Sequence, residues 1–338
     1  MSRFKEVGVS YFSNRFSDHF KKDLIDLKRD GFNSILHTYS EEDFKWSQGN
    51  VADMCKLSKD KGFKVWIDPW AVLRIFGGES LSWWLLANPD IWQVMSDGQS
   101  EPMACFNNPK TLSLMKEWID SAMKMEIDTV MWDEPHFAIK NWIMAKGKNL
   151  IWGCRCAICQ KKFEKKYNKK MPVNFDQEVT DFRSNSIKEF LTKLSLYVRE
   201  IKGKTIKIST VLVSIENAMK RGASFEDMAK IKEVDDLGVD PYWFWMDPKP
   251  NVYEHNYKFA KLITDICKQY KKESHFWLQG FRIPKGREGE LSTAMQAAKD
   301  SGVDKFWVWG YQGCHMMSSL TSGDPKKVWQ TIVKELKK

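Results

Sequence analysis

The sequence has 338 residues, a hydrophobic content of 43% and a formal net charge of +9. This length suits one large domain, and the hydrophobic content is ordinary for a globular protein with one sizeable core. No apolar stretch approaches the ~20 residues needed to cross a bilayer, and the N-terminal sequence lacks a signal-peptide pattern. Because the Lys residues are scattered among Asp and Glu, we interpret them as solvated helix faces and expect neither a nucleic-acid-binding surface nor membrane association.

Tryptophan and cysteine are the unusual residue types. There are 16 Trp residues, more than packing alone usually requires. Aromatic side chains with a polar edge suit the apolar faces of sugar rings, and they also suit nucleobases. The cysteine count is seven, and four of these cysteines have the spacing of metal ligands. This usage fits a reducing cytoplasm better than secretion.

A short β-rich run followed by an amphipathic helix is repeated along the chain. The runs contain many Val, Ile, Phe, Trp and Tyr residues, as strands buried on both sides do. The eight runs are Val7–Phe12, Ser34–Tyr39, Phe63–Trp70, Asp128–Glu134, Ile206–Val213, Asp236–Trp245, His275–Phe281 and Lys305–Tyr311. Strict alternation favours a parallel sheet with helical crossovers, so we predict an α/β protein with a single (β/α)8 TIM barrel over residues 1–338.

Helical segments separate the runs. The clearest are Asp18–Asp30, Lys110–Met125, Tyr253–Lys271, Glu290–Ser301 and the C-terminal Pro325–Lys337. An open doubly wound sheet is the alternative fold, but no glycine-rich phosphate loop follows the first run. We interpret the Gly77-Gly78 pair as a plain loop.

Two long excursions follow the third and fourth runs, at Ala71–Asn108 and Pro135–Gln177. In barrels, the loops at the carboxyl ends of the strands build the active site. The functional residues are therefore expected there.

The fourth run ends in two adjacent acids, Asp133 and Glu134, followed by Pro135. This pattern predicts two carboxylates at the barrel mouth, because proline ends the strand directly after them. Burial beside Trp132 would raise the pKa of a carboxyl group, as a general acid at neutral pH requires. The alternative interpretation is a helix N-cap, where acids are common.

Other predicted strands also end in polar and aromatic residues, which would lie near Asp133 and Glu134. Each residue alone could equally be a core or capping residue, and their shared position on one rim is the argument for a site. The predicted substrate-binding residues are Asp68, Trp70, His136, Asp240, Tyr242, Trp243, Gln279, Arg282, Trp309 and Tyr311, and His37 and Tyr39 end the second run.

A cysteine cluster lies in the second excursion. Cys154, Cys156 and Cys159 fall within six residues, and Cys105 lies upstream in the other excursion. Four thiolates can fill a tetrahedral zinc shell, which leaves no open position and makes the ion structural. This ion would join the two excursions, giving a metal-binding loop region over residues 105–159. Unpaired structural cysteines and an iron–sulfur cluster are the alternatives.

These features together resemble the catalytic barrel of glycoside hydrolase family 42, the zinc-containing β-galactosidases. The resemblance covers roughly residues 60–175. It rests on Glu134, on the four cysteines, and on the flanking Asn88-Pro89-Asp90-x-Trp92, Asp97-Gly98, Phe163 and Tyr167. It implies that Glu134 is the acid/base carboxylate and that the cysteines bind zinc. We expect a single barrel domain without the family's additional C-terminal domains.

Two positions depart from the family pattern. Asp133 stands where the family has Asn, and Gln279 stands where the family has its nucleophilic Glu. A neutral amide cannot form a glycosyl-enzyme ester. An Asp-Glu pair on the fourth strand is similar to that of substrate-assisted hexosaminidases, in which the acetamido group of the substrate is the nucleophile. Alternatively, Glu134 and Asp240 form an inverting pair, if their carboxyl groups lie roughly 6.5–9.5 Å apart.

We therefore expect a cytoplasmic glycoside hydrolase that binds a carbohydrate substrate and a structural zinc ion. In this hypothesis Glu134 is the general acid/base and Asp133 orients the substrate. Two alternatives stay open: a barrel that binds sugar without hydrolysing it, and an enzyme that holds a divalent metal through Asp68, Asp133, Glu134 and Asp240. The sequence leaves the sugar and the formation of a homo-oligomer open.

Overall fold

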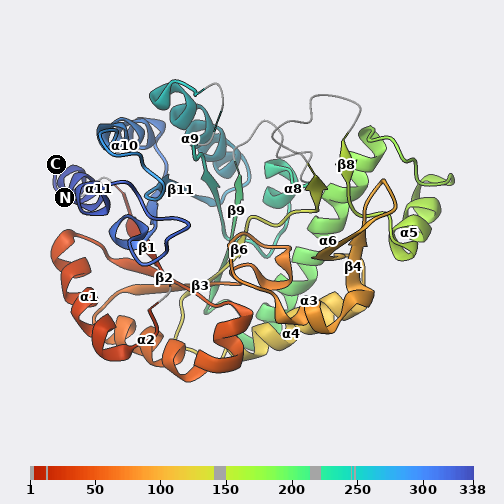
Figure 1. The fold of residues 1–338 in the computed structure, drawn as a ribbon, viewed down its shortest axis with the longest axis horizontal. Coiled ribbons are helices and arrows are strands. Elements are labelled where there is room, and N and C mark those ends of the chain that lie inside the picture. The colour runs from red at the N-terminus through yellow and green to blue at the C-terminus, as the bar shows by residue number, and fades with distance from the viewer. Residues whose placement is uncertain (1–3, 13, 141–149, 214–221, 245, 247–248) are drawn as a thin grey trace.

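In the computed structural model, residues 4–12, 14–140, 150–213, 222–244, 246 and 249–338 are described. Eight parallel strands close into a barrel in the order β1-β12-β11-β10-β9-β6-β3-β2, so the predicted (β/α)8 fold is confirmed (Figure 1). The barrel strands are β1 (Glu6–Tyr11), β2 (Ser34–Thr38), β3 (Lys64–Asp68), β6 (Thr129–Asp133), β9 (Lys207–Val213), β10 (Asp236–Asp240), β11 (Glu273–Gln279) and β12 (Lys305–Trp309).

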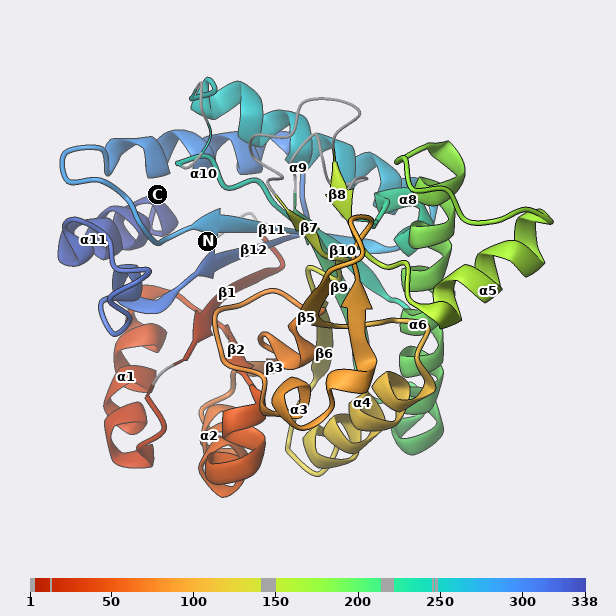
Figure 2. The same ribbon diagram turned by 45° about the vertical axis from the view of Figure 1, so that its right-hand side comes forward.

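Helices surround the barrel in both ribbon views (Figures 1 and 2). The α-helices are α1 (Ser17–Asp30), α2 (Gln48–Asp60), α3 (Trp83–Ala87), α4 (Pro109–Ala122), α5 (Ala157–Tyr167), α6 (Gln177–Lys202), α8 (Phe225–Ala229), α9 (Val252–Gln269), α10 (Gly289–Ser301) and α11 (Pro325–Leu336). Shorter helices are η1 (Asp43–Ser47), η2 (Val72–Arg74), η3 (Pro89–Ile91) and η4 (Tyr311–Cys314). None of the helices among the described residues has the length and apolar character needed to span a bilayer.

Several strands end earlier than the sequence analysis predicted. β3 ends at Asp68 and β10 at Asp240, each directly before a proline, whereas the predicted runs continued to Trp70 and Trp245. Proline has no N–H to donate to a ladder, so it ends pairing inside a sheet. Trp245 itself lies outside the described residues. The acids at these ends are therefore the last paired residues of their strands.

The two excursions form small antiparallel hairpins beside the barrel. β4 (Trp92–Val94) pairs with β5 (Ser100–Ala104), and β7 (Ile139–Lys140) pairs with β8 (Ile151–Trp152). The two hairpins are joined by backbone hydrogen bonds, from Ser96 N to Trp152 O at 2.7 Å and from Arg155 N to Val94 O at 2.7 Å. Figures 1 and 2 show this region and α5 at one side of the barrel.

Side chains alternate between the barrel interior and the shell of helices, as the two-residue period of a strand requires. On β12, Trp307 and Trp309 belong to the interior cluster, whereas Phe306 and Val308 belong to the cluster that packs against the helices. On β3, Trp66 likewise points inward. The interior cluster contains five of the described Trp side chains, at positions 66, 70, 277, 307 and 309.

A buried polar network closes the amino end of the interior. Lys305 Nζ lies 2.6 Å from Asp236 Oδ2, and both side chains are buried. His275 Nε2 lies 2.9 Å from Ser209 Oγ, and Trp277 Nε1 donates to His275 Nδ1 at 3.0 Å. Because Nδ1 accepts this bond, the imidazole is neutral. Burial lowers the pKa of His275 from 6.5 to about 4.

This pKa shift predicts a loss of stability in acid. As the pH falls below 6.5 the unfolded chain binds a proton at His275 that the folded chain does not bind until about pH 4, so the free energy of unfolding decreases. Urea unfolding at pH 7 and pH 5 should show that His275→Gln has a pH dependence weaker than wild type by roughly 2 kcal/mol. The exposed His19, changed to Gln, is the matched control for the loss of an imidazole. An unaltered pH dependence in His275→Gln would contradict the assignment.

Candidate active site

Three acids end their strands with side chains directed into the barrel. Asp68 on β3, Asp133 on β6 and Asp240 on β10 share the inward parity of Trp66, Met131 and Gly238 on the same strands. All three are buried, with Asp68 fully so. No other described residue hydrogen-bonds to either carboxylate oxygen of Asp68. The predicted meeting of these acids at one rim is thus seen in the structure.

Glu134 follows β6 in an unusual backbone conformation. Its φ is 39°, in the left-handed region that non-glycine residues rarely adopt. Its backbone N–H still donates to Val211 O at 3.1 Å, and its carbonyl oxygen lies 2.6 Å from Nδ1 of His136. Continued strand geometry would direct Glu134 outward among the helices. The turn instead brings its side chain to a hydrogen bond with Asp240. Strain of this kind gathers at functional sites.

Burial and mutual repulsion keep protons on Asp133 and Asp240. Burial raises the pKa of Asp133 well above its usual range, and the nearby Asp68, Glu134 and Glu79 raise it further. Burial also raises the pKa of Asp240, with a contribution from Glu134. Like charges in a poorly solvated site disfavour ionisation. Asp133 and Asp240 therefore retain protons at pH values where exposed carboxyl groups have lost them.

The loop after β3 presses directly on the acids. Gly77 N–H donates to Asp133 O at 3.0 Å, and a Cβ on Gly77 would lie 2.8 Å from Asp133 Oδ2. A Cβ on Gly78 would lie 2.2 Å from the Trp70 indole. The Gly77-Gly78 pair is therefore more than a plain loop, because Gly77 packs against the Asp133 carboxyl group and Gly78 packs against the Trp70 indole.

Glu79, next in this loop, is a site residue that the sequence analysis missed. Burial raises the pKa of its carboxyl group, Glu134 raises it further, and Arg282 opposes the rise. Its electrostatic contact with Asp133 and Glu134 places it beside the pair at the mouth. Its position directly after the Gly77-Gly78 pair was the only sequence signal.

Aromatic rings surround the acids at the mouth. Phe12 stacks on both Trp70 and Trp309, with ring centroids 5.6 Å apart in each pair. Trp277 meets Trp309 edge to face at 5.7 Å, and Tyr242 meets Phe281 at 5.1 Å. All belong to the interior cluster. Trp70, Tyr242 and Trp309 thus lie where the sequence analysis placed them.

Other predicted contact residues are directed elsewhere. Trp243 is fully buried in the outer cluster, and its Nε1 donates to Glu290 Oε2 at 3.0 Å. Gln279 Oε1 accepts from the backbone N–H of Trp243 at 2.9 Å, so the amide holds the loop after β10. The Tyr311 hydroxyl donates to Asp23 at 3.1 Å.

Two further predicted groups lie at the edge of the site or outside it. Arg282 is exposed, and its Nε donates to Ser319 O at 2.7 Å. His37 and Tyr39 face the outer helices, with His37 Nε2 3.1 Å from Ser58 Oγ and Tyr39 OH 2.6 Å from Ser121 Oγ.

The N-cap interpretation of Asp133 and Glu134 is wrong, since the next described element after them is the β7 strand.

Similarity to known proteins is seen at the level of fold. No family model matches the sequence, and no curated protein is similar to it in sequence. The catalytic domain of β-amylase from Paenibacillus polymyxa superposes with a TM-score of 0.67 at 11% identity, covering 98% of this chain and 99% of that chain. The endo-β-1,4-mannanase from Thermotoga petrophila gives 0.62 at 11% identity, covering 99% and 76%. That from Rhizomucor miehei gives 0.64 at 11% identity, covering 99% and 94%. At such identities the likeness shows the fold.

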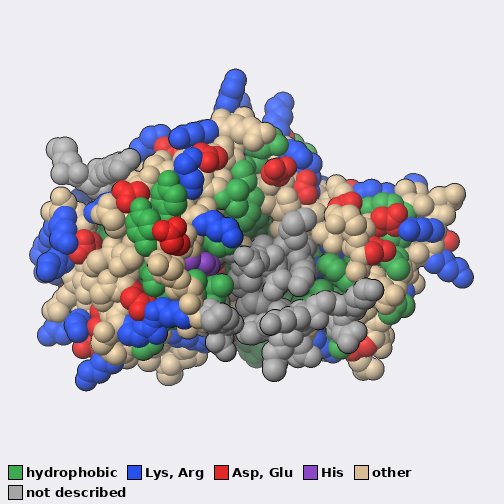
Figure 3. Space-filling view, turned by 90° about the horizontal axis from the view of Figure 1, so that it is seen from above, with side chains coloured by type: hydrophobic (Ala, Val, Ile, Leu, Met, Phe, Trp, Pro, Cys, Tyr) green, Lys and Arg blue, Asp and Glu red, His purple; other side chains and the backbone are tan. Residues whose placement is uncertain are grey.

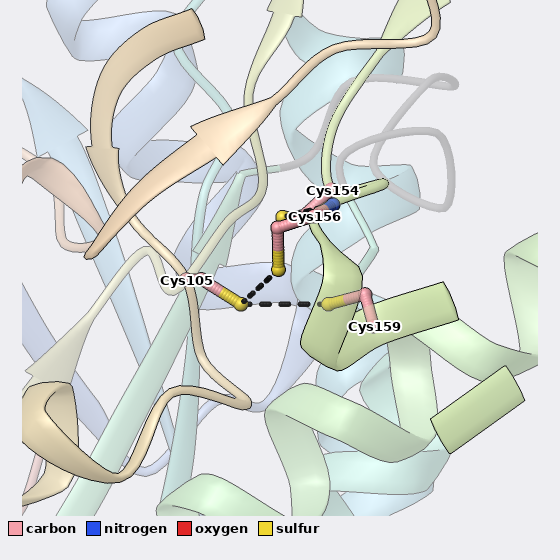
Figure 4. A group of neighbouring side chains, drawn as sticks. All are labelled: Cys105, Cys154, Cys156 and Cys159. Carbon is pink, nitrogen blue, oxygen red and sulfur yellow. Dashed lines mark hydrogen bonds between the residues drawn. The ribbon is translucent and has the colours of Figure 1, made fainter. Parts of the chain in front are cut away.

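The four predicted metal ligands come together between the two excursions (Figure 4). Their sulfur atoms all lie within 4.8 Å of one another. Cys105 Sγ lies 3.4 Å from Cys159 Sγ and 3.6 Å from Cys156 Sγ, too far for a disulfide. A tetrahedral shell with metal–sulfur bonds of about 2.3 Å separates its sulfurs by about 3.8 Å. The cluster therefore matches the spacing of a four-thiolate metal site.

Nearby groups suit the negative charge of such a site. Asn107 Nδ2 donates to Cys159 Sγ at 3.2 Å, and the fully buried Arg183 interacts electrostatically with Cys154. Among the described residues, no group of three or more acids or histidines converges closely enough to hold a metal ion elsewhere. The divalent-metal alternative at the barrel mouth thus lacks a preformed set of ligands there.

We predict that the purified protein contains one metal ion per chain, measured by elemental mass spectrometry. Cys159→Ser should lose most of this metal and lower the thermal midpoint, because a structural ion contributes directly to folding. Cys267→Ser, another buried cysteine outside the cluster, is the matched control and should retain the metal. Equal metal content in the two variants would contradict the site.

The close approach of Gly77 generates a stability prediction. Gly77→Ala should lower the free energy of unfolding by about 1–3 kcal/mol, because the new methyl group overlaps the buried Asp133 carboxyl. Gly49→Ala, where a Cβ meets nothing within 4 Å, should be neutral or stabilising. Urea denaturation measures both. A Gly77→Ala protein as stable as wild type would show that the loop is not packed on the acids.

Proposed function

We propose that this chain is a glycoside hydrolase with Glu134 as its general acid/base. The observation that supports this most is the turn at Glu134, which directs its carboxyl group into a cluster of inward-facing acids under an aromatic rim. Aromatic walls with a few convergent polar groups are typical of ligand pockets and suit sugar rings. The β-amylase and the mannanases of similar fold act on carbohydrates, which agrees with the proposal.

The arrangement favours a substrate-assisted reaction over an inverting pair. An inverting enzyme needs roughly 6.5–9.5 Å between its carboxyl groups, so that water fits between them. Glu134 and Asp240 are hydrogen-bonded to each other, which is much closer. Gln279, at the end of β11, is engaged by backbone groups and is no nucleophile. A nucleophile supplied by the substrate removes the need for a second enzymic carboxylate.

In the proposed reaction, Glu134 donates its proton to the glycosidic oxygen as that bond breaks. The acetamido oxygen of the substrate attacks the anomeric carbon and forms a cyclic intermediate. Glu134 then takes a proton from the water that opens the ring. Asp133, next to Glu134 and deeply buried, orients the acetamido group, and Tyr242 offers a hydroxyl donor beside Asp240.

The resemblance to glycoside hydrolase family 42 enters this proposal through the cysteines. In this proposal Cys105, Cys154, Cys156 and Cys159 bind structural zinc, as thiolate ligands in a tetrahedral shell prefer. The ion would hold the excursion after β3, which contains Gly77 and Glu79, against the excursion after β6. Its role would be to support the mouth, since four thiolates leave no position for substrate.

A barrel that binds sugar without cleaving it is the second candidate. Gln279 favours it, because this amide replaces the carboxylate that a retaining enzyme with its own nucleophile would need. Hydrolysis that depends on Glu134 would exclude this candidate.

The test is hydrolysis of a panel of 4-nitrophenyl glycosides that includes N-acetylhexosaminides. Glu134→Gln should lower kcat/KM about 10²–10⁴-fold, because the proton donor is lost. Asp133→Asn should lower kcat/KM for N-acetylhexosaminides, because Asp133 orients the acetamido group in the proposed reaction. The exposed Glu254 on α9, changed to Gln, is the matched control. Turnover that survives Glu134→Gln would remove Glu134 from the mechanism.

A further inference from the structure

A cavity lies beside the aromatic rim of the mouth, between the ends of β1 and β12 and helix α1. Its volume is about 230 Å³. We call it the side cavity and define it by its lining residues, which are Ser10, Tyr11, Phe12, Asn14, His19, Asp23, Tyr311, Gln312, Cys314 and Met316. A cavity of ~150 Å³ accommodates benzene, so this one accommodates a six-membered ring with substituents.

Hydrogen bonds give this cavity an ordered polar wall. The hydroxyl groups of Tyr11 and Tyr311 both donate to the Asp23 carboxylate, at 2.5 and 3.1 Å. Asn14 Nδ2 donates to the Tyr11 hydroxyl at 3.1 Å, and Gln312 Nε2 donates to the Tyr311 hydroxyl at 3.0 Å. Each primary amide has a second N–H. The chain of bonds thus fixes two amide groups with donor capacity beyond the bonds that hold them.

A buried hydroxyl group adds a further polar contact. Ser10 lies on β1 with its side chain inward and completely buried, and no described residue hydrogen-bonds to its Oγ. Buried hydroxyl groups normally have a partner, because an unpaired one costs free energy. A polar ligand in the side cavity would supply that partner.

The apolar part of the lining is shared with the mouth. Phe12 lines the side cavity and also stacks on Trp70 and Trp309. Cys314 likewise belongs both to the lining and to the interior cluster. A ligand at the mouth that extends past Phe12 therefore enters the side cavity.

The charge of the lining selects the class of ligand. The described residues that line the side cavity include one carboxylate, the imidazole of His19 and no Lys or Arg. The carboxylate already accepts two phenol hydrogen bonds. A phosphate or another anion meets the Asp23 carboxylate and no Lys or Arg, whereas a neutral ligand with hydroxyl groups meets amides, an imidazole, a serine and an aromatic ring. Sugars combine hydroxyl edges with apolar ring faces.

We propose that the side cavity binds a second sugar unit of the substrate whose first unit lies at the mouth. This inference rests on the proposed function, which places the first sugar unit at the mouth. It concerns the number of sugar units that the protein binds and not the cleavage of the bond between them. In this proposal Tyr311 contributes to substrate binding in the side cavity and not beside Glu134. The protein then prefers substrates of at least two sugar units.

The experiment compares matched one-sugar and two-sugar ligands. Met316 is 59% exposed at the cavity, so Met316→Trp can block it without disturbing the core, and Met316→Leu is the matched control. The probes are 4-nitrophenyl glycosides of single sugars and of the corresponding β-1,4-linked disaccharides, with binding of the free sugars to Glu134→Gln protein measured by calorimetry.

We expect wild type to prefer the two-sugar probe by about tenfold, the worth of one or two hydrogen bonds. Met316→Trp should abolish this preference and leave the one-sugar probe unaffected, whereas Met316→Leu should retain it. Absence of a length preference in wild type, or its survival in Met316→Trp, overturns the second sugar site whether or not hydrolysis occurs. A length preference in binding without any hydrolysis would support the side cavity and contradict the proposed enzyme activity.

Discussion

The burial of three carboxyl groups at the carboxyl end of the barrel interior is the constraint on which the rest of the site depends. At the amino end, Lys305 neutralises Asp236 directly. At the other end, Asp68, Asp133 and Asp240 are close to one another, and their pKa values are raised by burial. Arg15 acts on Asp68 from a distance, because its guanidinium is bound to Asp43 at 2.6 Å. The barrel interior thus holds an ion pair at its amino end, and carboxyl groups with raised pKa values at its carboxyl end.

The two excursions pack against the acids and against each other at this end of the barrel. The loop with Gly77 and Gly78 fits over Asp133 and Trp70 only because it has no side chains there. Its continuation forms the β4–β5 hairpin and reaches Cys105, which meets the cysteines that follow β8. The loop that packs on the acids is thus continuous with the segment that carries Cys105.

On the face seen in Figure 3, Lys and Arg are interspersed with Asp and Glu, as the sequence analysis expected of solvated helices.

The departures from expectation have a common physical cause. A sequence shows which residues end a strand, but whether each faces the interior depends on parity and on the backbone beyond the strand. Trp70 and Trp309 end up inside, whereas Trp243 faces the helices and Tyr311 reaches Asp23 on α1. Glu134 breaks the parity through its positive φ. Glu79 had no local pattern, because its place comes from the fold of a long loop.

The sequence by itself determined the barrel, the strand ends with their acids, and the set of four cysteines. These follow from periodicity, from proline after Asp68 and Asp240, and from ligand spacing, all of which are local properties. Only the tertiary structure decided that Glu134 turns to Asp240, that the Gln279 amide is occupied by backbone groups, and that a side cavity adjoins Phe12. Such contacts join residues far apart in the chain, and their geometry exists only once the barrel has closed.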